Sequence, residues 1–137
     1  MAAFIIKARG EITPPPPAMQ RFVDVPPSSI FYSFIDRMAV LGITSGCTAS
    51  PPMYCPASPV TRDQMAAFII RGLSIFDPPT PSSQRFLDVP PTNLFYKFVE
   101  EMAVRGITAG CGGGNYCPGQ PVTRAEMAAF LVRAFDL

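Results

Sequence analysis

Apolar side chains recur at helical spacing in two matching stretches of the chain. Four of them fall at i, i+3, i+4 and i+7 in each stretch: Phe31, Phe34, Ile35 and Met38, and then Phe95, Phe98, Val99 and Met102. This spacing places each set on one face and predicts an amphipathic helix. Ser28 and Ser29 are candidates for the N-cap of the first helix. Gly42 and Gly106 predict left-handed C-terminal stops, with the isoleucine that follows each one folding back on the last turn.

A second helix is predicted after each of these. Thr61 with Gln64, and Thr123 with Glu126, match the Thr-x-x-Glu/Gln capping box in front of an apolar run. The expected buried faces are Met65, Phe68 and Ile69 in the first copy and Met127, Phe130 and Leu131 in the second. Helices this short are marginal alone, so each must bury its apolar stripe against neighbours.

The two stretches are copies of one another. Residues 21–47 return as residues 85–111, and residues 54–71 return as residues 116–133, mostly with conservative changes. The opening MAAFII is identical to residues 65–70, so the sequence starts within a repeat. We therefore predict five segments: the closing helix of a partial repeat (1–10), a Pro-rich linker (11–20), a repeat (21–73), a second Pro-rich linker (74–84) and a repeat (85–137). The linker prolines favour extended polyproline geometry, which makes semi-rigid spacers.

Composition narrows the class of function. The chain has 137 residues, of which 48% are apolar and only 15% charged, with a formal net charge of +1. The apolar content is enough for a packed core, and no basic field exists to gather nucleic acid, which is not an expected partner. No apolar run approaches the roughly 18 residues that a membrane span needs. The N-terminal MAAFIIKARG lacks the features of a signal peptide, so a secreted form is expected to be a mature protein or a fragment.

Four cysteines, Cys47, Cys55, Cys111 and Cys117, occupy equivalent places between the two helices of each copy. Pairing within each repeat, Cys47 with Cys55 and Cys111 with Cys117, is favoured because it requires no contact between distant copies. The alternative is a zinc site, for which the cysteine spacing is unusual and no histidine is present. Disulfides would place the chain in an oxidising, extracellular environment.

The residues that enzymes use for acid-base or nucleophilic chemistry are not arranged in any recognisable pattern, so the chain is predicted not to be an enzyme and to need no cofactor. Two recurring pairs are the candidate binding residues. Asp24 and Asp88 stand before Val-Pro, where an aspartate either holds a turn or contacts a ligand. Arg62 and Arg124 lie in the first turn of a helix, where a cation opposes the macrodipole. Each arginine either contacts the neighbouring repeat or offers a donor fork to an acidic glycan group.

At these motifs the sequence resembles the S-layer homology family. The shared features are Phe-x-Asp-Val-Pro at residues 22–26 and 86–90, Gly-Ile-Thr at 42–44 and 106–108, and Pro-Val-Thr-Arg at 59–62 and 121–124. The resemblance implies an all-α fold of helix-loop-helix repeats packed as a pseudo-threefold prism. It also implies an extracellular location at the bacterial cell surface, non-covalent attachment to cell-wall-linked polysaccharide, and Arg62, Arg124, Asp24 and Asp88 as the candidate glycan-binding residues.

The sequence departs from the family at positions that bear on function. Ile30 and Leu94 stand where the family carries a tryptophan that grips glycan, and Cys47 and Cys111 replace an aromatic residue. Two functions follow as hypotheses. The favoured one is a structural protein that assembles with itself into a surface layer, sheath or filament, since repeat ends that differ suit head-to-tail contacts. The alternative is an anchor module that binds cell-wall polysaccharide and attaches a larger secreted protein.

Overall fold

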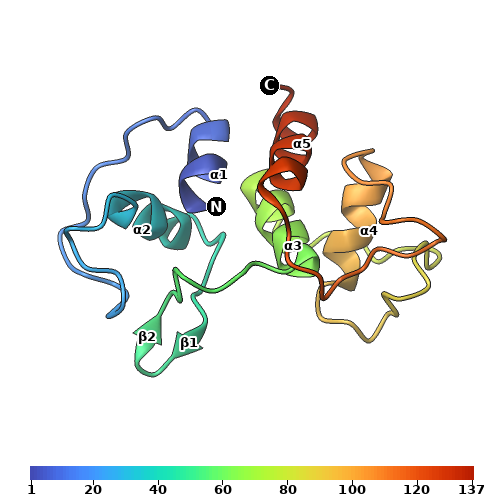
Figure 1. The fold of residues 1–137 in the computed structure, drawn as a ribbon, viewed down its shortest axis with the longest axis horizontal. Coiled ribbons are helices and arrows are strands. Elements are labelled where there is room, and N and C mark those ends of the chain that lie inside the picture. Colours follow the sequence, from blue (N-terminus) through green and yellow to red (C-terminus); the bar gives the residue numbers. More distant parts are fainter. The chain divides into compact units, whose positions relative to one another are not determined.

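The computed structural model describes residues 1–137 and is mainly helical, with one small hairpin (Figure 1). Its elements are α1 (Ala2–Ala8), α2 (Tyr32–Val40), β1 (Thr48–Ala49), β2 (Pro52–Met53), α3 (Arg62–Gly72), α4 (Tyr96–Val104) and α5 (Arg124–Phe135). They form two compact units, Met1–Ser58 and Pro59–Leu137. The mainly helical class predicted from the periodicity is confirmed, whereas a threefold arrangement of repeats stays a prediction.

In the first unit, α1 packs against α2. Ile5 of α1 and Ile35 and Met38 of α2 are buried, as the apolar spacing predicts. The Lys7 ammonium lies 5.4 Å from the centre of the Phe34 ring, a cation–π contact between the two helices. In this unit the closing helix of the partial repeat, α1, therefore packs against the first helix of the next repeat, α2.

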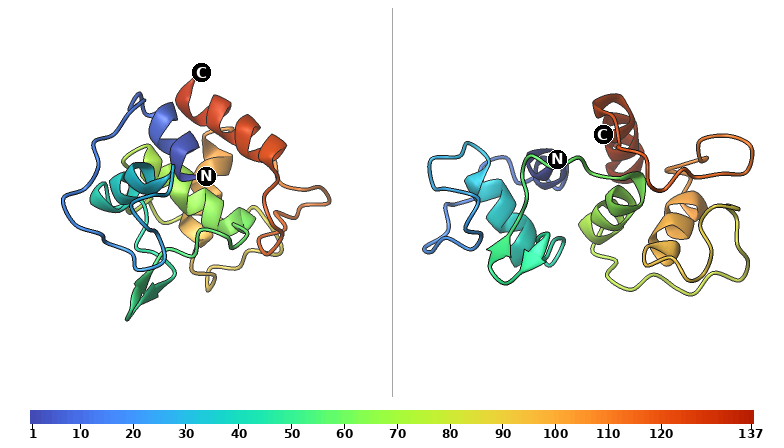
Figure 2. Two further views of the ribbon diagram at one scale, coloured as in Figure 1. Left: turned by 60° about the vertical axis from the view of Figure 1, so that its left-hand side comes forward. Right: turned by 60° about the horizontal axis from the view of Figure 1, so that its bottom comes forward.

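The second unit repeats that pairing and extends it. Here α3 packs against both α4 and α5 (Figure 2). The Arg71 guanidinium lies 4.9 Å from the centre of the Phe98 ring. This contact is equivalent to that of Lys7 with Phe34 in the first unit. The boundary between the two units follows Ser58 and so falls within the predicted repeat at 21–73, because α3 packs with the helices of the next copy.

The helix ends follow the local chemistry of the sequence. Gly42 adopts a φ of 70°, and the Ile43 N–H donates to the Met38 carbonyl at 2.9 Å, which closes α2 with a Schellman motif. The prediction for its start was wrong: the N-cap is Phe31 and neither Ser28 nor Ser29, although the Phe31 N–H donates to the Ser29 hydroxyl at 3.2 Å. Phe31 therefore precedes the helix and is half exposed instead of joining the buried stripe.

The loops between the two helices of each copy are closed by disulfides. Cys47 is bonded to Cys55 and Cys111 to Cys117, in agreement with the pairing favoured from the repeats. The first loop contains the antiparallel hairpin β1–β2, which the sequence did not predict. The second, shorter loop makes only a single bridge between Gly112 and Asn115.

Candidate functional site

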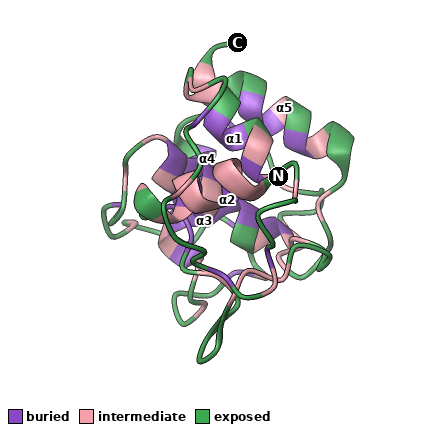
Figure 3. Cartoon of the chain, turned by 90° about the vertical axis from the view of Figure 1, so that its left-hand side faces the viewer, coloured by how far each residue is buried: buried purple, intermediate pink, exposed green.

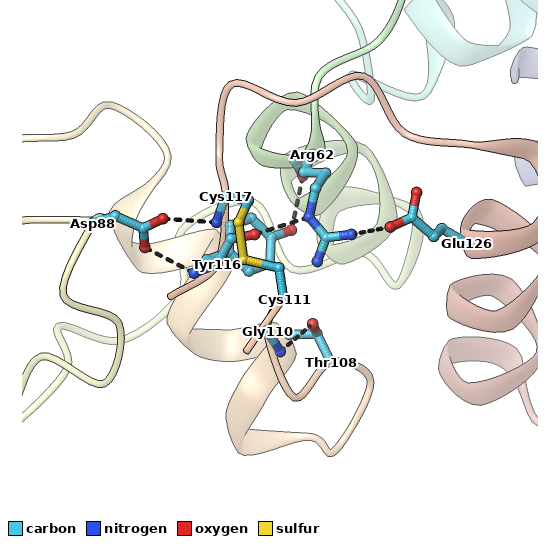
Figure 4. The surroundings of a disulfide bond; sticks show 8 residues. All are labelled: Arg62, Asp88, Thr108, Gly110, Cys111, Tyr116, Cys117 and Glu126. Atoms are coloured by element: carbon cyan, nitrogen blue, oxygen red, sulfur yellow. Dashed lines mark hydrogen bonds and ion pairs between the residues drawn. A yellow bond between two sulfur atoms is a disulfide. The ribbon is translucent and has the colours of Figure 1, made fainter. Parts of the chain in front are cut away.

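The aspartates of the two Asp-Val-Pro turns hold the disulfide loops. The Asp88 carboxylate accepts hydrogen bonds from the backbone N–H groups of Tyr116 and Cys117, both at 2.8 Å (Figure 4). Asp24 accepts the corresponding bonds from Tyr54 at 2.8 Å and Cys55 at 2.7 Å. The turn interpretation of these aspartates therefore has a concrete partner in each copy.

The disulfide loop of the first copy changes the pKa of Asp24. Burial favours its neutral form, but hydrogen bonds from the N–H groups of Tyr54 and Cys55 outweigh this and lower the pKa of Asp24. Cys55 has a φ of 58° and Cys117 a φ of 60°. The residue that donates to each aspartate through its N–H therefore has a left-handed backbone conformation. The fixed conformation of that residue aims its N–H at the aspartate.

Arg62 lies in a buried site made by the second copy. Its side chain is 4% exposed; Nε donates to the Tyr116 carbonyl at 2.9 Å, and Nη1 forms an ion pair with Glu126 at 2.5 Å (Figure 4). The guanidinium lies 4.9 Å from the Tyr116 ring centre and 5.5 Å from that of Phe130. We name Tyr116, Glu126 and Phe130 the Arg62 receptor. These are the salt bridge and stacking contacts that the structural interpretation of Arg62 requires.

The carboxylate of the receptor performs two tasks at once. Oε2 of Glu126 accepts from the Thr123 N–H at 2.8 Å and completes the capping box of α5, while Oε1 receives Arg62. The Thr123 bond is the largest influence that lowers the pKa of Glu126, and Arg62 acts in the same direction. The anionic cap of α5 offsets the unfavourable position of Arg62 in the first turn of α3.

Tyr116 links the receptor back to α3. Its hydroxyl donates to the Arg62 carbonyl at 2.8 Å, and burial raises the pKa of the phenol well above its usual value. The phenol therefore remains protonated and keeps donating across the physiological pH range. The tyrosine in the first copy, Tyr54, is less buried, and its pKa is raised to about 12.

Arg124 occupies the same motif position in α5 and a different environment. Its side chain is exposed, whereas Arg62 is buried. The structure therefore separates the two arginines by burial: Asp24, Asp88 and Arg62 make the contacts described above, and Arg124 lies at an exposed position. Sequence reasoning had not singled out Tyr116 as a site residue, and had identified Glu126 only as a cap. The tyrosine that precedes the second cysteine of each copy was the available signal.

Other kinds of site are limited by direct observations. All four cysteines are disulfide-bonded, so none is a thiolate ligand, and the zinc alternative is wrong. No cluster of three histidine, cysteine, aspartate or glutamate side chains is placed to bind a metal ion. None of the helices combines the length and apolar character required to cross a membrane.

The chain is similar to segments of much larger proteins. It is 29% identical over 115 residues to a protein named "Endoglucanase" from Bacillus sp. (strain KSM-635), covering 84% of this chain and 12% of that one. It is 31% identical over 123 residues (82% and 15%) to a "Cell surface protein" of Thermoanaerobacter kivui. It is 33% identical over 103 residues (75% and 5%) to an "Amylopullulanase" of Thermoanaerobacterium thermosulfurigenes. The chain thus spans only a small part of each relative.

The fold places the chain in the class of repeat proteins built from helix-loop-helix copies. Residues 85–128 match the model of the S-layer homology domain, so the chain carries a repeat of that family. This domain is a non-catalytic module for cell-surface attachment. With the two disulfides, it assigns the chain an extracellular location at the cell surface.

Proposed function

We propose that this chain is an anchor that holds a larger secreted protein to cell-wall-linked polysaccharide without a covalent bond. One observation carries the proposal. Relatives named for two different catalytic activities and one named as a cell surface protein share this segment, which covers at most 15% of their length. A segment common to proteins with such different names is best explained by an accessory task, and attachment is the task of the matched domain.

Arg124 is the residue proposed to contact the polysaccharide. Arg124 lies at an exposed position, and an arginine side chain carries a planar donor fork that fits a carboxylate on an acidic sugar. Asp24, Asp88 and Arg62 are proposed to act indirectly, because their polar atoms hold the disulfide loops and the contact of α3 with α5. Recognition by the chain then rests on one exposed arginine together with the surface around it.

Co-sedimentation with purified cell walls tests this function. We expect the wild-type chain to sediment with walls that carry their polysaccharide and to stay in solution with walls stripped of it. Arg124→Ala is expected to weaken binding by about tenfold, the loss of one charge-assisted contact. Arg85→Ala, which removes the same charge from an exposed position outside α5, is the matched control and should bind like wild type.

Two results would contradict the proposal. If wild type ignores the polysaccharide, the anchor function is wrong. If wild type binds and Arg124→Ala binds equally well, the anchor function stands and the assignment of Arg124 is wrong. Circular dichroism of each variant establishes that it is folded.

A second candidate function is self-assembly into a surface layer, sheath or filament. It is favoured by an exposed face of α5 whose counterpart on α3 is buried. A surface that is buried in the first copy and exposed in the second suits association between chains. This candidate does not exclude attachment to polysaccharide.

A further inference from the structure

We propose that the disulfide loop of the first unit binds a peptide segment of the Val-Thr-Arg type, with Tyr54 receiving the arginine. The carbonyl groups of Pro56 and Ser58 complete the site, which is named here the Tyr54 site. The inference goes beyond the function proposed above and is independent of attachment to polysaccharide. It is argued from a contact within the second unit and from the matching groups of the first unit.

The second unit shows what such a loop binds. Nε of Arg62 donates to the Tyr116 carbonyl at 2.9 Å, its guanidinium lies 4.9 Å from the ring centre, and the Tyr116 hydroxyl donates to the Arg62 carbonyl at 2.8 Å (Figure 4). The N–H of Arg62 also donates to the Gln120 carbonyl at 2.9 Å, and the N–H of Asp63 to the Pro118 carbonyl at 3.2 Å. The first N–H groups of α3 thus find their acceptors in this loop. One loop therefore binds an arginine side chain together with the backbone around it.

The loop of the first unit is built in the same way. The rings of Phe22 and Tyr54 have their centres 5.6 Å apart, and the equivalent rings of the second unit are 5.4 Å apart. Asp24 accepts from the Tyr54 N–H at 2.8 Å, the same distance as the equivalent bond in the second unit. After the second cysteine, the Ser58 N–H donates to the Cys55 carbonyl at 3.0 Å, and the equivalent bond of the second loop measures 3.2 Å. The acceptors of the second loop therefore have counterparts in the first that are held by the same hydrogen bonds.

The Tyr54 site is accessible. Pro56 and Ser58 are exposed and Tyr54 is partly exposed, in a loop that lies at the surface of its unit (Figure 3). No backbone N–H of the chain donates to the carbonyl groups of these three residues. The neighbouring helix α1 contains no arginine, and its N-cap Met1 has the motif position that follows residues 59–64. A bound segment equivalent to 59–64 would therefore end where α1 begins and would not overlap with this helix.

Charge sets the expected strength of this contact. The Asp24 carboxylate accepts from the Tyr54 N–H and its pKa is lowered, so an anion lies next to the site at neutral pH. The first unit has no counterpart of Glu126, because the residue at that motif position, Gln64, belongs to the second unit. The bound arginine therefore lacks the ion pair that Arg62 forms. We expect a dissociation constant of about 1 mM, which is weak in solution and sufficient when both partners are held at one surface.

Titration of the full chain with a synthetic peptide of residues 59–64, blocked at both ends, tests the proposal. Binding is followed by the backbone amide signals of the chain in NMR spectra. We expect shifts of the signals of Cys55 and Ala57 and none of those of Cys117 and Gly119, because the second loop already binds α3. The same peptide with Arg62→Gln is the matched control and should bind about tenfold more weakly, the loss of one charge-assisted contact.

A variant of the chain tests the role of the tyrosine. Tyr54→Phe removes the hydroxyl whose equivalent in the second unit donates to the backbone of the bound segment. We expect it to weaken binding of the peptide by about fivefold, the loss of one hydrogen bond. Tyr32→Phe removes a tyrosine hydroxyl from a partly exposed position on α2; it is the control and should bind like wild type.

Shifts confined to the first loop, together with weaker binding of the Arg62→Gln peptide, support the Tyr54 site. The absence of shifts at about ten times the expected dissociation constant, or equal binding of the two peptides, would overturn it. Equal binding by Tyr54→Phe and wild type would also overturn it, provided that the spectrum of the variant shows a folded chain. The comparison of the two peptides uses the wild-type chain and does not depend on the folding of any variant.

Discussion

The two Thr-Arg helices differ more in their surroundings than in their sequence. In α3 the arginine of the motif is 3% exposed and joined to Tyr116 and Glu126; in α5 the same motif places Arg124 at the surface. A short motif therefore determines the position of the arginine on the helix, but it does not determine which residues contact the side chain. The repeat packed against the helix decides whether the arginine of the motif is buried or exposed.

Of the changes considered, removal of a disulfide is expected to have the largest effect on the free energy of unfolding. Closing loops of these lengths, with sequence separations of 8 and 6, stabilises by about 2.5 kcal/mol for each pair in the chain-entropy model. Changing Cys111 and Cys117 to Ser should lower the free energy of unfolding by more than the same change at Cys47 and Cys55. The reason is that the second loop also carries Tyr116, whose carbonyl and hydroxyl bind Arg62 and its backbone.

Urea unfolding of the two double variants measures this difference. Equal losses would mean that the second loop does not support the site of Arg62. A greater loss in the first copy would contradict the comparison outright.

Acid gives a smaller and graded test. The pKa of Asp24 is lowered from 3.8 and that of Glu126 from 4.5, so both groups bind protons more weakly in the folded chain. Their contribution to stability is fully present above these values and is lost as the pH falls through the lowered pKa of each group. We expect the free energy of unfolding to fall below about pH 4.5. Glu126→Gln should make the fall shallower and leave less stability at neutral pH, and an unchanged pH profile would contradict the role of this carboxylate.

Local chemistry explains the parts of the fold that the sequence predicted. The capping boxes at Thr61 and Thr123, the glycine stop at Gly42 and the pairing of the cysteines depend on residues close together in the chain, which a pattern can display. The repeats also located the candidate residues of the site. The two copies could be aligned in sequence without any knowledge of the fold.

Long-range partners explain what the sequence did not predict. Arg62 and Arg124 share one motif, and only the packing of α3 against the second copy separates a buried side chain from an exposed one. The hairpin β1–β2 arises in a disulfide loop with no alternating pattern to reveal it. Phe31 fits the helical spacing and yet precedes the helix, because spacing alone does not mark where a helix begins.

The central claim is that one motif gives a buried, stabilising arginine at Arg62 and an exposed arginine at Arg124. Urea unfolding of Arg62→Ala and Arg124→Ala, measured side by side at neutral pH, tests it most directly. Arg62→Ala should cost about 2 kcal/mol, because it removes the buried packing of the guanidinium and leaves the Tyr116 carbonyl without its donor. Arg124→Ala should cost clearly less than Arg62→Ala, because Arg124 lies at an exposed position where solvent screens its interactions. Equal losses for the two variants, or a greater loss for Arg124→Ala, would contradict the account.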